Sequence, residues 1–301
     1  MDWGQWYPKL RQNMVHDADS FDVESKVCRL HVAVNHFLEM PRDSQGKIYT
    51  GLGLQLSVGK KMNDSPHISV ILPVYQQADH IEQIVNGYVT ALESLKYSVE
   101  IILVVNASLD GSLECCRRLE QNDGRVRVLH NEQPGWGRAV RSGLSASRGR
   151  ILAYTNSART SPYILALHLM LAATNSELVI KANRRLRLPL VRRIGSVLYN
   201  VECRTLFDLP VWDVNGTPKV FNREIFEKLD LRENGDLIDL EFILRCKELG
   251  LQLLEIPIVS EVRHGGESTT NLFSAFKMYW GAFLMRYRLN NDKGPDRGPQ
   301  N

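Results

Sequence analysis

Residues 68–75 read ISVILPVY, and residues 99–105 read VEIILVV. Both stretches are continuous apolar runs, which are typical of strands that a parallel sheet buries on both faces. Two shorter runs follow, VRVLH at residues 126–130 and ILAYT at residues 151–155. Between these runs we expect helices at residues 79–95, at residues 112–121 and in a segment that ends near residue 146. Strands and helices that alternate at this spacing predict a mostly parallel α/β sheet with right-handed connections.

The chain beyond residue 161 continues a less regular α/β pattern. We expect further helices at residues 162–173, in the basic stretch between residue 182 and about residue 207, and at residues 237–249. We expect further strands at residues 177–182, 218–222 and 251–259. Apolar runs bounded by turn residues favour strands, whereas longer segments of three- and four-residue periodicity favour helices.

Four parts are expected along the chain. They are an N-terminal extension (1–66), an α/β domain (67–271), an amphipathic helix (272–290) and a disordered tail (291–301). In the extension, apolar residues at three- and four-residue intervals predict a helix at residues 23–38 that ends before Pro41. Alternating apolar residues then predict a strand at residues 52–58. We expect the extension to be a packing arm or a dimer element.

Composition excludes several classes of protein. A chain of 301 residues with 44% hydrophobic content is long enough to bury a full core. Its 37 basic and 34 acidic residues nearly balance, so the overall charge does not predict nucleic-acid binding. The first residues lack the apolar segment of a signal peptide, and no run of eighteen apolar residues predicts a membrane span. Five cysteines without metal-ligand spacing favour a reducing, cytoplasmic environment.

The order of motifs resembles the inverting family 2 glycosyltransferases of GT-A fold, especially the dolichyl-phosphate-mannose-synthase-like branch. The matching segments cover roughly residues 67–270 and are ILPVYQQADHI, VVNASLDGS, NEQPGWGRAVRSGLSASRG, LAYTNSARTSP, WDVNGTPKVFNRE, DLEFILRCKELG, LEIPIV and RHGGEST. The resemblance implies a Rossmann-like sheet that binds a UDP- or GDP-sugar at the carboxyl ends of its strands. It places Pro73 and Tyr75 beside the nucleotide base, although Tyr75 is equally compatible with capping the strand end.

Neutral residues stand where the resembled family carries acids. Asn156, Ser157 and Ala158 occupy the metal-binding Asp-x-Asp position, Gln77 replaces a glutamate, and Asn106 replaces the acid that contacts the base. Mg²⁺ and Mn²⁺ prefer oxygen ligands that include carboxylates. We therefore expect no protein ligand set for a metal and no tightly bound cofactor. The alternative is a weakly held Mg²⁺ or Mn²⁺ that arrives with the donor.

Cations of the protein are expected to replace the metal. The leaving nucleoside diphosphate accumulates negative charge, which an arginine can stabilise through two phosphate oxygens. Arg159 directly follows the neutral motif, although a solvated loop position explains it slightly better. Arg263 and His264 lie in a loop that resembles the family's R-x-x-G-E-S-K motif, in which Thr269 replaces the lysine.

The acceptor side is expected near the basic stretch KANRRLRLPLVRR at residues 181–193. In the resembled branch, basic residues of this region meet the phosphate of a polyprenyl-phosphate acceptor, a role that would fall to Arg184 and Arg185. An ordinary solvated helix face is the alternative. The acceptor is thus a polyprenyl phosphate or a small molecule. The glycine-rich PGWGRA at residues 134–139 favours a tight turn over a phosphate-binding loop.

Asp213, in the segment WDVNGTPK, is the first candidate for a base or an acceptor-orienting residue; capping of its own loop is the alternative. Glu241 and Asp239 are the second candidates for the base. They lie two positions apart on an expected helix and face different ways, so at most one of them can point into a cleft. The aromatic and basic terminal helix predicts a peripheral membrane contact, core packing or a homodimer interface.

Two functions follow from these residues. The first is a glycosyltransferase of the hexosyltransferase type that inverts the transferred sugar without a tightly bound metal. The second is a pseudoenzyme that keeps the sheet and binds a partner without turnover.

Overall fold

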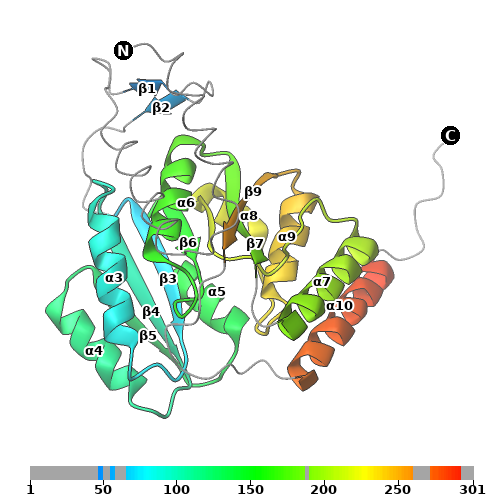
Figure 1. Ribbon diagram of the computed structural model, residues 1–301, viewed down its shortest axis with the longest axis horizontal. Helices are drawn as coiled ribbons and strands as arrows, with labels where there is room; N and C mark the ends of the chain where they lie inside the picture. Colours follow the sequence, from blue (N-terminus) through cyan, green and yellow to red (C-terminus); the bar gives the residue numbers. More distant parts are fainter. Residues whose placement is uncertain (1–46, 50–54, 58–65, 187–189, 260–271, 293–301) are drawn as a thin grey trace. The chain divides into compact units, whose positions relative to one another are not determined.

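The computed structural model describes residues 47–49, 55–57, 66–186, 190–259 and 272–292 (Figure 1). The chain divides into two compact units, residues 1–58 and 59–301. In the first unit, β1 (Lys47–Tyr49) and β2 (Gln55–Ser57) pair antiparallel, so β2 confirms part of the strand expected at residues 52–58. The helix expected at residues 23–38 lies outside the described residues, as do residues 293–301 of the expected tail.

A mixed sheet forms the centre of the second unit. In its described part the seven strands run in the order β5-β4-β3-β6-β8-β7-β9. Their bounds are β3 (Ile68–Val74), β4 (Val99–Asn106), β5 (Val126–Asn131), β6 (Ile151–Tyr154), β7 (Leu178–Leu186), β8 (Lys219–Asn222) and β9 (Gln252–Val259). Only β8 runs antiparallel to its neighbours β6 and β7, whereas the other described pairs are parallel. The predicted mostly parallel α/β sheet is therefore confirmed.

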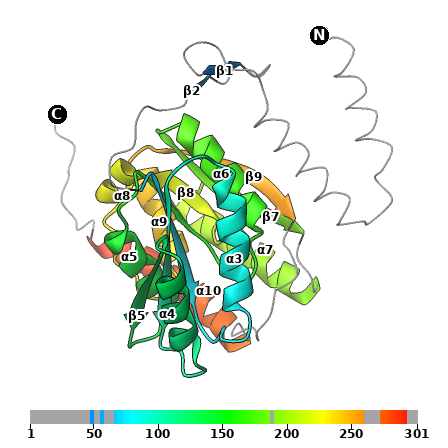
Figure 2. The same ribbon diagram turned by 90° about the vertical axis from the view of Figure 1, so that its left-hand side faces the viewer.

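Helices cover both faces of this sheet. They are α3 (Ile81–Glu93), α4 (Ser112–Asn122), α5 (Trp136–Ala146), α6 (Pro162–Thr174), α7 (Leu190–Phe207), α8 (Arg223–Leu229), α9 (Ile238–Glu248) and α10 (Leu272–Asp292). Buried residues of α3, α4 and α6 pack on one face, and those of α5, α7, α8, α9 and α10 pack on the other (Figure 2). Every residue of β3 is buried, because its alternating side chains enter both layers. Among the described helices, none has the length and apolar character that crossing a bilayer requires.

Strand β7 corrects one boundary that we expected from the sequence. The basic residues after position 182 were expected to be helical, but β7 continues to Leu186 and places Arg184 and Arg185 on a strand. Strand β9 pairs with β7 along this whole length, with a register shift between Arg184 and Leu186. A partner strand thus overrides the local composition, since strand formation depends on cross-strand packing more than on intrinsic preference.

The imidazole of His168 is fully buried between α6 and the sheet. Its Nδ1 lies 2.7 Å from the Ile164 carbonyl oxygen and donates to it, whereas Nε2 has no hydrogen-bond partner among the described residues. Burial is the main cause that lowers the pKa of His168 to about 4; the hydrogen bond to Ile164 opposes this shift, and the nearby charge of Lys181 adds to it. This histidine is therefore neutral in the folded protein at pH 7.

We expect His168 to make the protein sensitive to mild acid. Its pKa is lower folded than unfolded, so the unfolded chain binds more protons between about pH 6.5 and pH 4, and stability falls as the pH drops through this window. Between pH 7 and pH 4.5 the loss from this residue is about 2 kcal/mol. Urea unfolding of the wild type and of His168→Met at both pH values measures it, with His130→Met at an exposed position as control. Equal losses in the wild type and His168→Met would contradict this account.

Candidate functional site

The carboxyl ends of β3 and β6 bring the predicted neutral residues together. Ser157 and Gln77 are almost fully buried, and the Ser157 hydroxyl lies 3.0 Å from Gln77 Oε1 and 3.4 Å from the Pro73 carbonyl oxygen. The Asn156 Oδ1 atom accepts a hydrogen bond from the backbone N–H of Ala158 at 3.1 Å. Ser157 thus bonds to Gln77, while the neutral side chain of Asn156 accepts a hydrogen bond from its own turn.

A rigid turn after β3 supports this cluster. Gln76 has a φ of 49°, an uncommon left-handed conformation for a residue other than glycine. Its backbone N–H donates to Ser108 Oγ at 3.0 Å, and the N–H of Ala78 donates to Asp110 Oδ2 at 3.0 Å. Asp110 therefore anchors the turn. Tyr75 precedes this turn and is 37% exposed, so part of its ring is available to a ligand.

Asn106, at the end of β4, carries a buried oxygen without a partner. Its Nδ2 donates to the Gly135 carbonyl oxygen at 3.0 Å, but its Oδ1 has no hydrogen-bond partner among the described residues. Buried polar atoms without partners are rare in folded proteins. The Oδ1 atom of Asn106 is therefore a buried acceptor that the described residues leave unused.

The N-terminus of α5 is closed by a neighbouring loop. The backbone N–H groups of Gly137 and Arg138 donate to the carbonyl oxygens of Gly235 and Asn234 at 3.1 and 3.0 Å. A Cβ atom on Gly137 would lie 2.5 Å from the Glu233 carbonyl oxygen, so this close approach requires glycine. These contacts agree with the tight turn expected for PGWGRA, because the N–H groups that would hold a phosphate already have partners.

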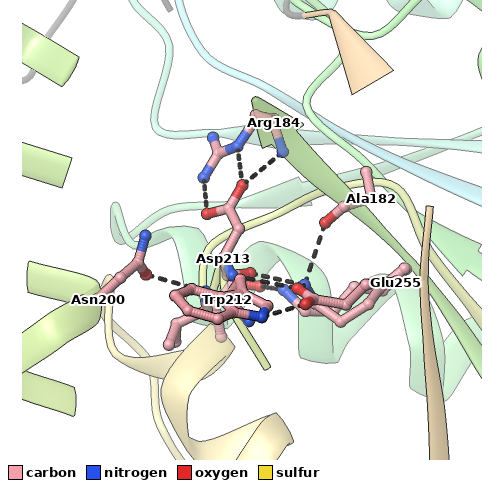
Figure 3. Close-up of polar contacts among 10 residues, drawn as sticks. Ala182, Arg184, Asn200, Trp212, Asp213 and Glu255 are labelled. Atoms are coloured by element: carbon pink, nitrogen blue, oxygen red, sulfur yellow. Dashed lines mark hydrogen bonds and ion pairs between the residues drawn. The ribbon is translucent and has the colours of Figure 1, made fainter. Parts of the chain in front are cut away.

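On the other half of the sheet, Arg184 and Asp213 form a two-point ion pair (Figure 3). Arg184 Nε lies 2.8 Å from Asp213 Oδ2, and Nη2 lies 2.9 Å from Oδ1. The backbone N–H of Arg184 donates to Oδ2 at 3.0 Å. Asp213 is almost fully buried, whereas Arg184 is partly exposed. The pair therefore fixes the direction of the guanidinium of Arg184, whose side chain is partly exposed.

Glu255 and Lys181 hold the loop that carries Asp213. Glu255 accepts hydrogen bonds from the backbone N–H groups of Trp212 and Asp213 at 2.7 and 3.1 Å (Figure 3). The ammonium of Lys181 donates to Glu255 Oε1 at 2.8 Å and to the Asp213 carbonyl oxygen at 2.6 Å. Burial lowers the pKa of Lys181 to about 8. Lys181, which belongs to the basic stretch at residues 181–193, therefore fixes the loop that carries Asp213 by bonding to Glu255 and to the backbone of that loop.

Asp239 and Glu241, the two second candidates for the base, both lie on α9 but contact different neighbours. Both oxygens of Glu241 accept hydrogen bonds from backbone N–H groups of Arg232 and Glu233, so Glu241 holds the loop that closes α5. Asp239 is buried and forms an ion pair with the buried Lys219. It also accepts hydrogen bonds from Tyr154 Oη at 2.9 Å and from Trp136 Nε1 at 3.1 Å.

Sequence reasoning missed this Lys219–Asp239 pair. The signal available was a lysine at the start of the short apolar strand KVFN, since a buried lysine requires a charged partner.

Of four further predicted site residues, the structure describes one with its side chain, one by its backbone alone and two not at all. Arg159 is half-buried in the turn after β6, where its backbone N–H donates to the Asn156 carbonyl oxygen at 3.1 Å. Arg185 lies on β7, but its side chain is not described. Arg263 and His264 lie outside the described residues. The predicted roles of these four residues stay predictions.

The side chains at the strand ends do not suit a tightly held divalent metal. Within the described ranges, no three histidine, cysteine or acidic side chains gather as a metal site. Gln77, Asn156 and Ser157 offer neutral oxygens that already take part in hydrogen bonds. Mg²⁺ and Mn²⁺ favour carboxylate oxygens, so this donor set does not fit either ion as a resident cofactor.

This mixed sheet, covered by helices on both faces and with polar residues at its strand ends, is the arrangement expected for the GT-A fold. Residues 69–159 match the glycosyl transferase family 2 model. The expected resemblance to this family and the expected GT-A fold are confirmed.

Individual relatives agree with this assignment. Glycosyltransferase AglD of Haloferax volcanii is 30% identical over 204 residues, which are 64% of this chain and 32% of the relative. Undecaprenyl-phosphate 4-deoxy-4-formamido-L-arabinose transferase of Edwardsiella ictaluri is 31% identical over 28% of this chain and 27% of the relative. The chain thus spans about a third of the length of these curated relatives.

Among solved structures, glucosyl-3-phosphoglycerate synthase of Mycobacterium tuberculosis is similar in fold. Its complex with Mn²⁺, UDP and glucosyl-3-phosphoglycerate aligns with a TM-score of 0.57 at 19% identity, covering 74% of this chain and 80% of that one. At this identity the likeness concerns the fold alone.

Proposed function

We propose that this chain transfers a sugar from a nucleoside diphosphate donor, with inversion at the anomeric carbon and without a tightly bound divalent metal. The observation that carries the proposal is a match to the family 2 model in which the strand ends present the neutral side chains of Gln77, Asn156 and Ser157 in place of carboxylates. The chemistry must then rest on positive charges and hydrogen-bond donors of the protein.

The donor is expected to bind over the carboxyl ends of β3, β4 and β6. The unpartnered Oδ1 of Asn106 suits an N–H group of a nucleotide base, since uracil and guanine both present one. The exposed part of the Tyr75 ring suits stacking against the same base. The UDP complex of the mycobacterial synthase, which shares this fold, is compatible with a donor at these strand ends.

Arginine is the expected counter-charge for the departing diphosphate. As the glycosidic bond breaks, its electron pair moves to the leaving phosphate oxygen, and a guanidinium binds such oxygens with two hydrogen bonds. Arg159 is a candidate in the described chain, because its backbone N–H donates to the Asn156 carbonyl oxygen. Arg263 and His264 are further candidates for the same phosphates.

The acceptor is expected to be anionic and to meet Arg184. Both oxygens of Asp213 already accept hydrogen bonds from Arg184, so Asp213 is better suited to orient that cation than to take a proton. An acceptor that is already an anion, such as a lipid phosphate, needs no base. The undecaprenyl phosphate in the name of the Edwardsiella relative supports a polyprenyl phosphate over a neutral small molecule.

The proposed metal independence can be tested directly with a chelator. We expect UDP or GDP to bind with a dissociation constant that EDTA changes less than about threefold, and transfer or donor hydrolysis to continue in EDTA, because protein cations hold the phosphates. Calorimetric titration and product analysis, each with and without Mn²⁺, measure both quantities. Abolition of transfer by EDTA overturns metal independence. Nucleotide binding without any turnover supports the pseudoenzyme instead.

The double variant Asn156→Asp/Ala158→Asp provides the matched comparison. It restores two carboxylates at the Asp-x-Asp position, so Mn²⁺ should now strengthen UDP or GDP binding at least about tenfold. The same titration without metal should show weaker binding than in the wild type, because the new charges repel the phosphates. If Mn²⁺ strengthens binding equally in the wild type, the neutral residues do not determine the response to metal.

A further inference from the structure

Exposed apolar side chains concentrate on one outer region of the second unit. Eleven large apolar side chains are exposed among the described residues. Seven of them lie on α7, on α10 or in the loop before Asp213, and we call them the outer patch: Val197, Leu198, Val201, Trp212, Trp280, Phe283 and Tyr287. A concentration of this kind on a folded domain marks an interaction surface.

Helices α7 and α10 lie side by side and run in the same direction (Figure 1). The Tyr279 hydroxyl donates to the Gly195 carbonyl oxygen at 2.6 Å, and the Arg286 guanidinium lies 5.9 Å from the Phe207 ring centroid. Tyr199 and Ala282 point into the core. At 100° per residue, the patch residues of both helices therefore face away from the core on the same outer side.

Basic residues border the outer patch. Between positions 277 and 288 of α10 the charged residues are Lys277, Arg286 and Arg288, all of them exposed. At the other edge, the Arg204 guanidinium stacks on Trp212, 3.8 Å from the ring centroid. Aromatic side chains with polar tips, surrounded by long basic side chains, suit the boundary between lipid headgroups and acyl chains.

We propose that the outer patch docks on the surface of an anionic lipid bilayer. The basic residues that border the outer patch, Lys277, Arg286 and Arg288 on α10 and Arg204 on α7, outnumber the one acid of α7 beside it, Glu202, and complement negative headgroups. A second copy of the chain is a poorer occupant, because a two-fold interface would bring the same basic residues against each other. The apolar residues enter the headgroup region while the arginines and the lysine remain at the phosphates.

The outer patch extends to the acceptor side of the site. Trp212 belongs to the patch, and the next residue, Asp213, holds Arg184 through two hydrogen bonds. Glu255 binds the backbone of both Trp212 and Asp213, so the two residues move as one. Docking would therefore bring Arg184 to the level of lipid phosphates. This last step rests on the proposed function, whereas the docking itself does not.

Co-sedimentation with vesicles tests the docking. We expect the 301-residue chain to bind phosphatidylcholine vesicles that contain about one third phosphatidylglycerol at least tenfold more strongly than pure phosphatidylcholine vesicles. Trp280→Ser/Phe283→Ser should weaken this binding at least about tenfold. The matched control, Leu249→Ser/Leu254→Ser, removes two exposed apolar side chains outside the patch and should bind as the wild type does. Lys277→Gln/Arg288→Gln should reduce the preference for the anionic vesicles.

Three results would overturn the docking. They are a wild type that binds neither vesicle, equal losses in the patch and control variants, and a wild-type dimer in light scattering that becomes monomeric in Trp280→Ser/Phe283→Ser without any vesicle binding. Melting curves of all variants separate these results from unfolding. Vesicle binding is measured without nucleotide, so a chain that binds vesicles but no nucleotide refutes the proposed function and leaves the docking intact.

Discussion

Asp213→Asn is expected to lower sugar transfer at least about a hundredfold while the dissociation constant of the donor nucleotide changes less than about threefold. The substitution removes the negative charge and one of the two acceptors that hold Arg184. The guanidinium then loses its fixed direction, and a small misplacement of a positioning group has a large effect on rate. Steady-state kinetics and a calorimetric titration of the nucleotide measure the two quantities.

The control for Asp213→Asn is Asp208→Asn. It makes the same chemical change five residues earlier in an exposed side chain that pairs with Lys247, and it should leave transfer unchanged. Arg184→Gln should resemble Asp213→Asn, because both variants remove the oriented cation. If Asp213→Asn retains the wild-type rate, Asp213 has no part in the mechanism. If it abolishes nucleotide binding as well, the assignment of this pair to the acceptor side is wrong.

Asp239→Ala is expected to lower the free energy of unfolding by about 3–5 kcal/mol. The substitution leaves the ammonium of Lys219, which is fully buried, without its ion-pair partner. It also deprives the Tyr154 hydroxyl and the Trp136 indole of their acceptor. Such a loss is a large fraction of the stability of an ordinary domain. Urea unfolding followed by circular dichroism measures it.

Two further variants test whether the loss of stability in Asp239→Ala comes from the unpaired buried charge of Lys219. Lys219→Met/Asp239→Leu replaces both partners by apolar side chains and should recover part of the stability, because no buried charge remains. Asp230→Asn breaks an exposed ion pair with Arg232, keeps a residue that tolerates the left-handed backbone at this position, and should leave the melting temperature unchanged. A loss for Asp239→Ala no larger than for Asp230→Asn would show that the buried pair does not stabilise the fold.

The described strands and helices follow the sequence pattern closely where local signals suffice. The continuous apolar runs predicted β3 and β4, which the structure places at Ile68–Val74 and Val99–Asn106. The helix around His168 was expected at residues 162–173 and ends at Thr174. In contrast, β7 extends four residues past its predicted end at residue 182, because its pairing with β9 depends on residues more than seventy positions away.

The sequence by itself determined the resemblance to family 2, the parallel core of the sheet and the neutral residues at the Asp-x-Asp position, since these depend on residue types and on their order along the chain. Only the tertiary structure decided which of the remaining charges act together. Arg184 and Asp213 are 29 positions apart and Lys219 and Asp239 are 20 apart, and each pair forms where separate elements of the sheet and its helices converge. Periodicity reports which face of an element is buried, but a charged side chain acquires its partner only when distant segments pack together, because burial without that partner is unfavourable.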